Sequence, residues 1–270
     1  MQYMNKQRKT AIVTGSTKGI GNGIANELAG KGFNVVITSR KEEQAVETAE
    51  KINAKGIAGK AIGAYFDLEK PESAQVLLNR ALNEFERLDV LVNNALSNSC
   101  VFPLHKLSDE QISFALTSNI TNILLLCRLA HNELAKTKGN IINISSVVVN
   151  RHIVGMPLYT IAKGALEQIT KVLASKWAED HVRVNAINPG FVKTSAAADF
   201  GVSEDVIERG REYHKRYHPL GRLGEPEDIG RLAAFMASDD AEFMTGSIVD
   251  CDAGYSIQGV QLYQDDRGFG

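Results

Sequence analysis

A tyrosine and a lysine, Tyr159 and Lys163, stand four residues apart in the segment YTIAK. The segment begins a helical pattern, and residues four apart on a helix lie on the same face. A phenol with its ordinary pKa of about 10 is a poor acid or base at neutral pH, but a neighbouring cation stabilises phenolate and lowers that pKa. Alone, such a pair is usually part of a solvated helix face. Beside a bound substrate it could transfer a proton.

The segment TGSTKGIG, residues 14–21, contains three closely spaced glycines, Gly15, Gly19 and Gly21. Glycines at a strand-to-helix turn supply unusual backbone angles, which is the simplest explanation of the motif. They also allow a backbone to approach a pyrophosphate at a helix N-terminus. The spacing differs from the better-known G-x-G-x-x-G, so the motif alone leaves both interpretations open.

Short apolar segments alternate with helical patterns along the chain. Strands are expected at 10–14, 34–38, 60–66, 89–93, 140–145, 182–187 and 247–251, and helices at 19–29, 41–54, 72–86, 109–136, 158–179 and 226–237. Strands that are apolar throughout belong to parallel sheets covered on both faces. The pattern predicts a single α/β domain over residues 1–270, with a Rossmann-like, doubly wound, mainly parallel seven-stranded sheet.

Polar or small residues follow the expected strands. Ligands of doubly wound folds bind beyond the carboxyl ends of the strands, and turns alone do not require so many such residues there. Besides the glycine-rich turn they are Ser39-Arg40, Asp67, Asn93 to Ala95, Ser145-Ser146 and Asn188 to Gly190. Their placement favours the phosphate cradle.

Composition excludes several classes of protein. The chain has 270 residues, 44% of them hydrophobic, and a net charge of −2, so no overall field attracts nucleic acid or an anionic membrane. No apolar stretch approaches the roughly 20 residues of a membrane span. The three cysteines and six histidines show no disulfide or metal-site spacing. We expect a cytoplasmic enzyme that uses no metal, nucleic acid or membrane.

Together these motifs resemble the short-chain dehydrogenase/reductase family, in its short single-domain type. The similar segments are TGSTKGIG, Asp67, NNA at 93–95, Asn119, Ser146, YTIAK, NPGFVKT at 188–194 and the C-terminal segment 220–254. They follow the family's order and spacing over about residues 9–256. The resemblance implies an oxidoreductase that interconverts a ketone and a secondary alcohol, similar to 3-oxoacyl-carrier-protein reductases and related ketoreductases.

The resemblance also implies the roles of the catalytic residues. Tyr159 would be the general acid/base, and Ser146 would hydrogen-bond the carbonyl oxygen of the substrate. Lys163 would lower the pKa of the tyrosine and hold the nicotinamide ribose. Asn119 would support a water-linked proton relay to that lysine. The alternation of the strand is expected to turn the neighbouring Ser145 away from the site.

A larger set of residues is expected to hold the dinucleotide. By resemblance, Asp67 would bind the adenine amino group, Asn94 would line the cleft, and Val192 and Thr194 would contact the carboxamide and the diphosphate. The full set is Gly15, Thr17, Lys18, Gly19, Ile20, Gly21, Arg40, Asp67, Leu68, Asn94, Ala95, Tyr159, Lys163, Pro189, Gly190, Val192 and Thr194.

The end of the second expected strand predicts which dinucleotide is used. A 2′-phosphate requires cations, whereas the free ribose of NAD is bound by a carboxylate at this place. The chain has Arg40 here and no acid before Glu42, and Lys18 projects from the glycine-rich turn toward the same place. This predicts NADP(H); two solvated surface cations are the simpler alternative.

The substrate side departs from the family pattern. The family's NNAG is NNAL here, so that Leu96 replaces a glycine and puts the substrate class in doubt, and its D-G-G is DAG at 252–254. The long segment at about 190–224 is expected to form a substrate lid. Leu96, Ser146, Tyr159 and Phe191 are expected to contact the substrate, with Phe200 nearby.

Three alternatives remain open for the substrate and the class of function. A 3-oxoacyl-carrier-protein reductase is the default of the family, but the turn at 178–181 (AEDH) is acidic and would repel an acidic carrier. This favours a small free carbonyl or alcohol substrate. A non-catalytic NADP-binding sensor is the alternative of a different class, and the intact catalytic set argues against it.

The helical segments 109–136 and 158–179 carry apolar residues on more than one face, including Ile123 to Leu126 in succession. A single sheet layer cannot cover both faces of a helix. A partner chain is therefore expected there, and the family resemblance implies a homotetramer.

Overall fold

Seven parallel strands form one sheet in the order β3-β2-β1-β4-β5-β6-β7. The computed structural model describes residues 8–195 and 202–258. The strands are β1 (Thr10–Val13), β2 (Asn34–Ser39), β3 (Ala61–Tyr65), β4 (Val90–Asn93), β5 (Asn140–Ile144), β6 (Arg183–Pro189) and β7 (Ile248–Cys251). The predicted α/β fold is confirmed, and every strand pair is parallel.

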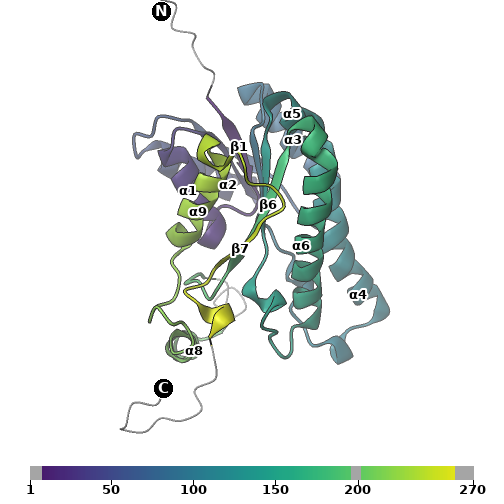
Figure 1. Cartoon of the computed structure of the whole chain (residues 1–270), viewed down its shortest axis with the longest axis vertical. Coiled ribbons are helices and arrows are strands. Elements are labelled where there is room, and N and C mark those ends of the chain that lie inside the picture. The colour runs from purple at the N-terminus through teal and green to yellow at the C-terminus, as the bar shows by residue number, and fades with distance from the viewer. Residues whose placement is uncertain (1–7, 196–201, 259–270) are drawn as a thin grey trace, which may run out of the picture.

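Helices cover both faces of the sheet (Figure 1). On one face lie α1 (Gly19–Gly30), α2 (Glu42–Asn53) and α9 (Pro226–Ala237); on the other lie α3 (Ser73–Phe85), α5 (Asn122–Thr137) and α6 (Pro157–Trp177). The helix α4 (Asp109–Leu116) continues into α5 through a π-helical turn, η3 (Thr117–Thr121). The short 3-10 helices are η1 (Asn98–Cys100), η2 (Leu104–Lys106), η4 (Val147–Val149), η5 (Ala178–Asp180), η6 (Asp239–Ala241) and η7 (Tyr255–Ile257).

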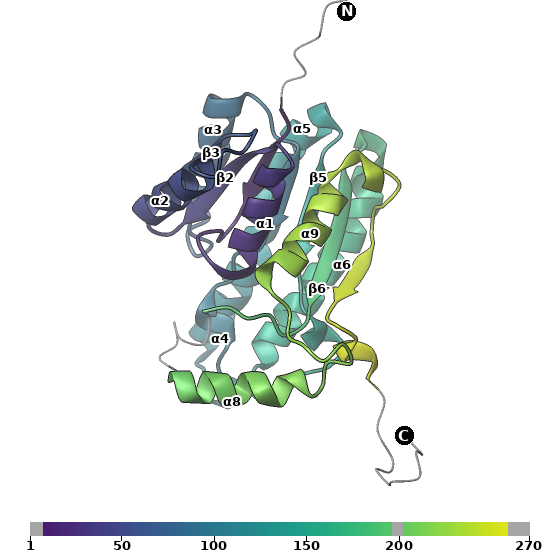
Figure 2. The ribbon, with the colours of Figure 1, turned by 90° about the vertical axis from the view of Figure 1, so that its left-hand side faces the viewer.

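The helix α8 (Glu204–Lys215) belongs to neither layer. It lies across the end of the molecule toward which the strands run (Figure 2). None of its residues is buried. It therefore stands apart from the core, at the edge of the sheet where ligands of such folds bind.

Alternate residues of the strands supply two cores. Val13 and Val35 pack with α1, α2 and α9 in one core, whereas Ile12 and Val36 pack with α3, α5 and α6 in the other. This is the pattern of a sheet buried on both faces. It explains why the strands are apolar along their whole length.

The helical run Asp109–Thr137 is long and apolar enough to cross a membrane, judged by length and composition alone. Its most apolar window has a mean hydropathy of 1.4. Core helices of globular folds share this property. Ile123, Leu126 and Leu134 are buried in the core with residues of α3 and the sheet. The helix α5 therefore packs on one face of the sheet.

Candidate active site

A cleft of about 900 Å³ opens at the carboxyl ends of the strands. It gathers residues from the segments after β1 to β6. Of the residues expected to hold a dinucleotide, the cleft is lined by Gly15, Thr17, Lys18, Gly19, Ile20, Gly21, Arg40, Asp67, Leu68, Asn94, Ala95, Tyr159, Lys163, Pro189, Gly190 and Thr194. Val192 is outside this lining and instead pairs with Gly224 in an isolated β-bridge.

The turn after β1 can be built only with glycine at two positions. Gly15 has a φ of +63°, and a Cβ added to it would lie 3.1 Å from the Cα of Ala95. A Cβ on Gly21 would lie 2.5 Å from the Nδ2 atom of Asn94 and would overlap the carbonyl oxygen of Gly15. The N-terminus of α1 that follows has no side-chain cap. A close backbone turn before an uncapped helix N-terminus fits a pyrophosphate.

Buried hydroxyls fix this turn, and sequence analysis missed them. The Oγ1 of Thr14 accepts hydrogen bonds from the N–H groups of Asn94 (2.9 Å) and Ala95 (3.0 Å). The Oγ1 of Thr38 accepts from the N–H of Gly15 at 2.9 Å. A threonine at the end of each of two neighbouring strands was the available signal.

The side chain of Asn94 lines the cleft and also holds the turn. Its Nδ2 donates to the carbonyl oxygens of Thr14 (2.8 Å) and Gly15 (3.0 Å). The side-chain amide of Asn94 therefore links the segment after β4 to the segment after β1. Asn94 thus stabilises the shape of the cleft from within.

The β2 end of the cleft is basic. Lys18 and Arg40 are both exposed and line the cleft, as does Lys41, which sequence analysis did not single out. The acids among the lining residues, Asp67 and Glu69, follow β3. The end of β2 therefore offers cations and no carboxylate within the described lining.

The predicted proton-transfer group lies at the opposite end of the same cleft. Ser146 follows β5, and Tyr159 and Lys163 belong to the first two turns of α6. The Nζ of Lys163 donates to the carbonyl oxygen of Ile144 at 2.7 Å and lies 5.8 Å from the centre of the Tyr159 ring. The hydroxyl of Ser145 donates to the backbone oxygen of Lys163 at 3.0 Å and is thus bonded to the backbone of α6.

Burial changes the pKa values of both Tyr159 and Lys163. It raises the pKa of the Tyr159 phenol, an effect that the hydrogen bond with Ser146 only partly offsets. Burial lowers the pKa of Lys163 from 10.5 to about 8. Desolvation is the main influence on the phenol here, and the expected lowering of its pKa by Lys163 stays a prediction. Tyr159 is therefore a protonated acid at neutral pH.

Asn119 lies behind the cleft rather than in its lining. It belongs to the π-helical turn η3 and is buried. Its Oδ1 accepts from the N–H of Ser97 at 2.9 Å, and its Nδ2 donates to the carbonyl oxygens of Ser97 (3.3 Å) and Ala115 (3.0 Å). Its side chain thus holds the loop after β4.

The expected substrate residues are divided between two places. Leu96, Ser146 and Tyr159 line the cleft. Phe191 is outside the described lining: its ring stacks on His214 of α8 with centroids 3.6 Å apart and contacts Tyr255 at 5.3 Å. Phe191 therefore attaches α8 to the end of β6.

The proposed lid over 190–224 is described only at 190–195 and 202–224. His218 is buried, accepts a hydrogen bond from the N–H of Phe191 at 3.3 Å and contacts Tyr255. We call Phe191, His214, His218 and Tyr255 the aromatic cluster. Phe200, expected beside the substrate, lies outside the described residues.

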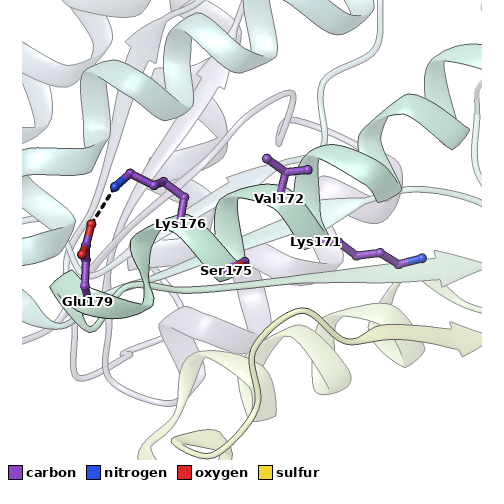
Figure 3. Close-up of a pocket in the computed structure, with 5 residues that line it drawn as sticks. All are labelled: Lys171, Val172, Ser175, Lys176 and Glu179. Carbon is purple, nitrogen blue, oxygen red and sulfur yellow. Dashed lines mark hydrogen bonds and ion pairs between the residues drawn. The ribbon is translucent and has the colours of Figure 1, made fainter.

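A second hollow of about 550 Å³ runs along the outer side of α6 (Figure 3). It is lined by Lys171, Val172, Ser175, Lys176 and Glu179. Lys176 and Glu179 form an ion pair of 2.7 Å across one end of it. This open surface brings together none of the predicted site residues.

The described part of the chain contains no candidate metal site and no disulfide. No group of three histidine, cysteine or acidic side chains in residues 8–195 and 202–258 could hold a metal ion. Cys100, Cys127 and Cys251 are free thiols.

Known proteins are similar over nearly the whole chain. Residues 15–256 match a family model described as enoyl-(acyl carrier protein) reductase. Glucose 1-dehydrogenase 2 of Bacillus subtilis is 35% identical over 96% of this chain and 99% of its own length. A 3-oxoacyl-(acyl-carrier-protein) reductase of Aquifex aeolicus is 36% identical over 92% of this chain and 97% of its own.

A solved structure is similar in its fold. The 3-ketoacyl-(acyl-carrier-protein) reductase from Brucella melitensis, in a crystal complexed with NADH, has a TM-score of 0.81 and 29% sequence identity. The similarity covers 92% of this chain and 98% of that one. With the relatives above, it confirms the predicted family. The chain belongs to the short-chain dehydrogenase/reductase family of oxidoreductases.

Proposed function

We propose that this protein is an NADP(H)-dependent reductase that interconverts a ketone and a secondary alcohol. The observation that carries the choice of cofactor is the basic end of the cleft at β2, with Lys18, Arg40 and Lys41 in its lining. Planar guanidinium and ammonium groups suit the 2′-phosphate of NADP. The relative complexed with NADH supports a nicotinamide dinucleotide in general.

The residues of the cleft fit such a dinucleotide. The glycine-rich turn and the N-terminus of α1 would hold the diphosphate, because their backbone allows close approach. Asp67 would hold the adenine, Lys163 the nicotinamide ribose, and Thr194 the diphosphate, all from the lining. When bound, the cofactor supplies the hydride.

The protein's own groups supply the proton. Tyr159, with its raised pKa, carries a proton at neutral pH and would donate it to the carbonyl oxygen of the ketone. The Ser146 hydroxyl would hydrogen-bond that same oxygen and stabilise its developing charge. Charged Lys163 nearby would favour the phenolate that remains. Ser146, Tyr159 and Lys163 line the same cleft, which argues against a non-catalytic sensor.

For the substrate we propose a free ketone rather than a carrier-bound 3-oxoacyl chain. The turn before β6 carries Glu179 and Asp180 and no lysine or arginine of its own, and Glu179 pairs with the nearby Lys176, so the turn offers little basic surface to an acidic carrier. The similarity to carrier-protein reductases keeps that substrate as the second candidate.

The test is a spectrophotometric screen of NADPH oxidation over free ketones and a carrier-bound 3-oxoacyl substrate. We expect at least one free ketone to match the carrier-bound substrate in kcat/KM. A value more than about tenfold higher for the carrier-bound substrate would replace our substrate class with the second candidate. Failure to oxidise NADPH with every carbonyl would favour the sensor.

We further propose a homotetramer, located in the cytoplasm, in which α4, α5 and α6 pack against partner chains. Phe114, Leu124, Ile161 and Val172 on these helices are exposed, and Val172 lines the hollow of Figure 3. Exposed apolar side chains on helices of one layer favour association. Light scattering at micromolar concentration should give a tetramer mass, and a monomer mass would contradict the proposal.

A further inference from the structure

The loop after β4 is organised around one buried serine, Ser97. Its N–H and carbonyl oxygen are both bonded to the side chain of Asn119, and its carbonyl also accepts from the thiol of Cys100 at 3.3 Å. Its hydroxyl donates to the Oε1 of Glu69 at 2.6 Å and is shared with the Ser99 hydroxyl at 2.7 Å. Every polar atom of Ser97 is therefore engaged.

Glu69 reaches Ser97 from a different part of the sheet. It follows β3, is half-buried and lines the cleft. Its own segment is anchored twice, because Asp67 accepts from the N–H of Glu69 at 3.0 Å and Asn122 donates to the carbonyl oxygen of Leu68 at 2.8 Å. A short bond from a hydroxyl to an anchored carboxylate is a strong one.

The loop that this bond holds forms one wall beside Tyr159. Leu96 and Tyr159 both pack against the small cluster of Cys100, Ala115 and Leu158. A leucine side chain needs more room than a glycine, so a loop carrying Leu96 must be held firmly to keep its distance from the phenol. The Ser97 to Glu69 bond is placed to do this.

We propose that Glu69 is a positioning residue that acts through Ser97 to hold Leu96, Asn119 and the wall beside Tyr159 in place. The effect on turnover rests on the proposed function; the effect on the loop does not. Glu69 would touch neither the ketone carbon nor the transferred proton. Loss of its hydrogen bond should misplace the reacting groups rather than remove one of them.

The experiment compares Glu69→Ala, Glu69→Gln and the control Glu72→Ala. Glutamine keeps an acceptor oxygen for Ser97, and Glu72 is an exposed carboxylate of the same segment that lies outside the cleft lining. Amide hydrogen exchange of the peptide spanning residues 95–101 reports on the loop in the protein alone. Steady-state kinetics report kcat and the KM for NADPH.

For Glu69→Ala we expect faster exchange in the loop and a fall in kcat of about tenfold, while the KM for NADPH changes less than about threefold. Glu69→Gln should recover most of both losses, and Glu72→Ala should match the parent. In a double-mutant cycle, the effects of Ser97→Ala and Glu69→Ala should be less than additive, since both remove the Ser97 to Glu69 bond, while Ser97→Ala also removes the contact with Ser99.

Unchanged exchange in Glu69→Ala would overturn the proposal whatever the kinetics show. Faster exchange with an unchanged kcat would also overturn it, because the loop would then have no effect on positioning. A parent enzyme that reduces no ketone would contradict the proposed function, and the exchange rates would then decide the proposal. Faster exchange in Glu69→Ala alone would support the role of Glu69 in holding the loop, and unchanged exchange would reject it.

Discussion

The cofactor end of the cleft and the expected substrate end, where α8 lies outside the cleft lining, are built in different ways. At the cofactor end, backbone segments lie so close together that a Cβ on Gly21 would overlap the carbonyl oxygen of Gly15. The buried hydroxyls of Thr14 and Thr38 accept hydrogen bonds from the backbone of the turn and of the segment after β4. At the substrate end, α8 has no buried residue and is attached by the rings of the aromatic cluster. The first construction tolerates few side chains, whereas the second can change with little effect on the core. We infer that the backbone of the fold fixes the diphosphate site, whereas substrate choice depends on side chains.

The largest effect is expected at Tyr159, which lines the cleft at the end opposite β2. Tyr159→Phe removes the transferable proton and keeps the packing of the ring, so kcat should fall by roughly 10²–10⁴. The dissociation constant of NADPH, measured by fluorescence titration, should stay close to that of the parent. A variant that keeps more than about a tenth of the parental kcat would show that Tyr159 is not the general acid.

The pH dependence should follow Lys163. Because burial disfavours its ammonium form, this group loses its proton near pH 8 rather than 10.5. The kcat/KM for ketone reduction should therefore be constant at lower pH and fall, by up to about tenfold per unit, above about pH 8. Rate measurements from pH 6 to 10, with circular dichroism as a control for folding, test this. A constant kcat/KM up to pH 9.5 would contradict it.

The smallest effect is expected at the substrate end. Phe191→Ala removes the ring that stacks on His214, so α8 should be held less firmly. The KM for the ketone should rise by about two- to tenfold, in line with the modest energy of an aromatic pair. NADPH affinity should not change, and Phe235→Ala, which truncates an exposed ring on α9, is the matched control. An equal loss of NADPH affinity would show that the two ends are not independent.

The difference between the ends also explains what could be predicted. The strands and the glycine-rich turn were predictable because each rests on local sequence: apolar runs between turns, and glycines where no Cβ fits. Leu96 and Arg40 were placed at the cleft by their position after a strand, and both line it. Backbone constraints are visible in a single sequence.

What sequence analysis missed depends on contacts between distant segments. Nothing in the sequence indicates that Glu69 bonds to Ser97, or that Thr14 holds the backbone of Asn94, since each pair is far apart in the chain. Phe191 was expected beside the substrate, yet its ring packs on α8, whose position depends on tertiary contacts alone. The raised pKa of Tyr159 arises from burial, which a four-residue spacing does not reveal.

The ratio of kcat/KM for NADPH and NADH, measured with the best ketone of the screen, tests the proposed use of NADP(H) directly. Arg40 is expected to contribute a charge-assisted contact to the 2′-phosphate, so the parent enzyme should prefer NADPH by about tenfold or more, and Arg40→Asp should lose that preference. The control Lys31→Asp, which reverses an exposed charge outside the cleft lining, should keep it. Equal kcat/KM values for NADPH and NADH in the parent enzyme would contradict the proposed preference for NADP(H).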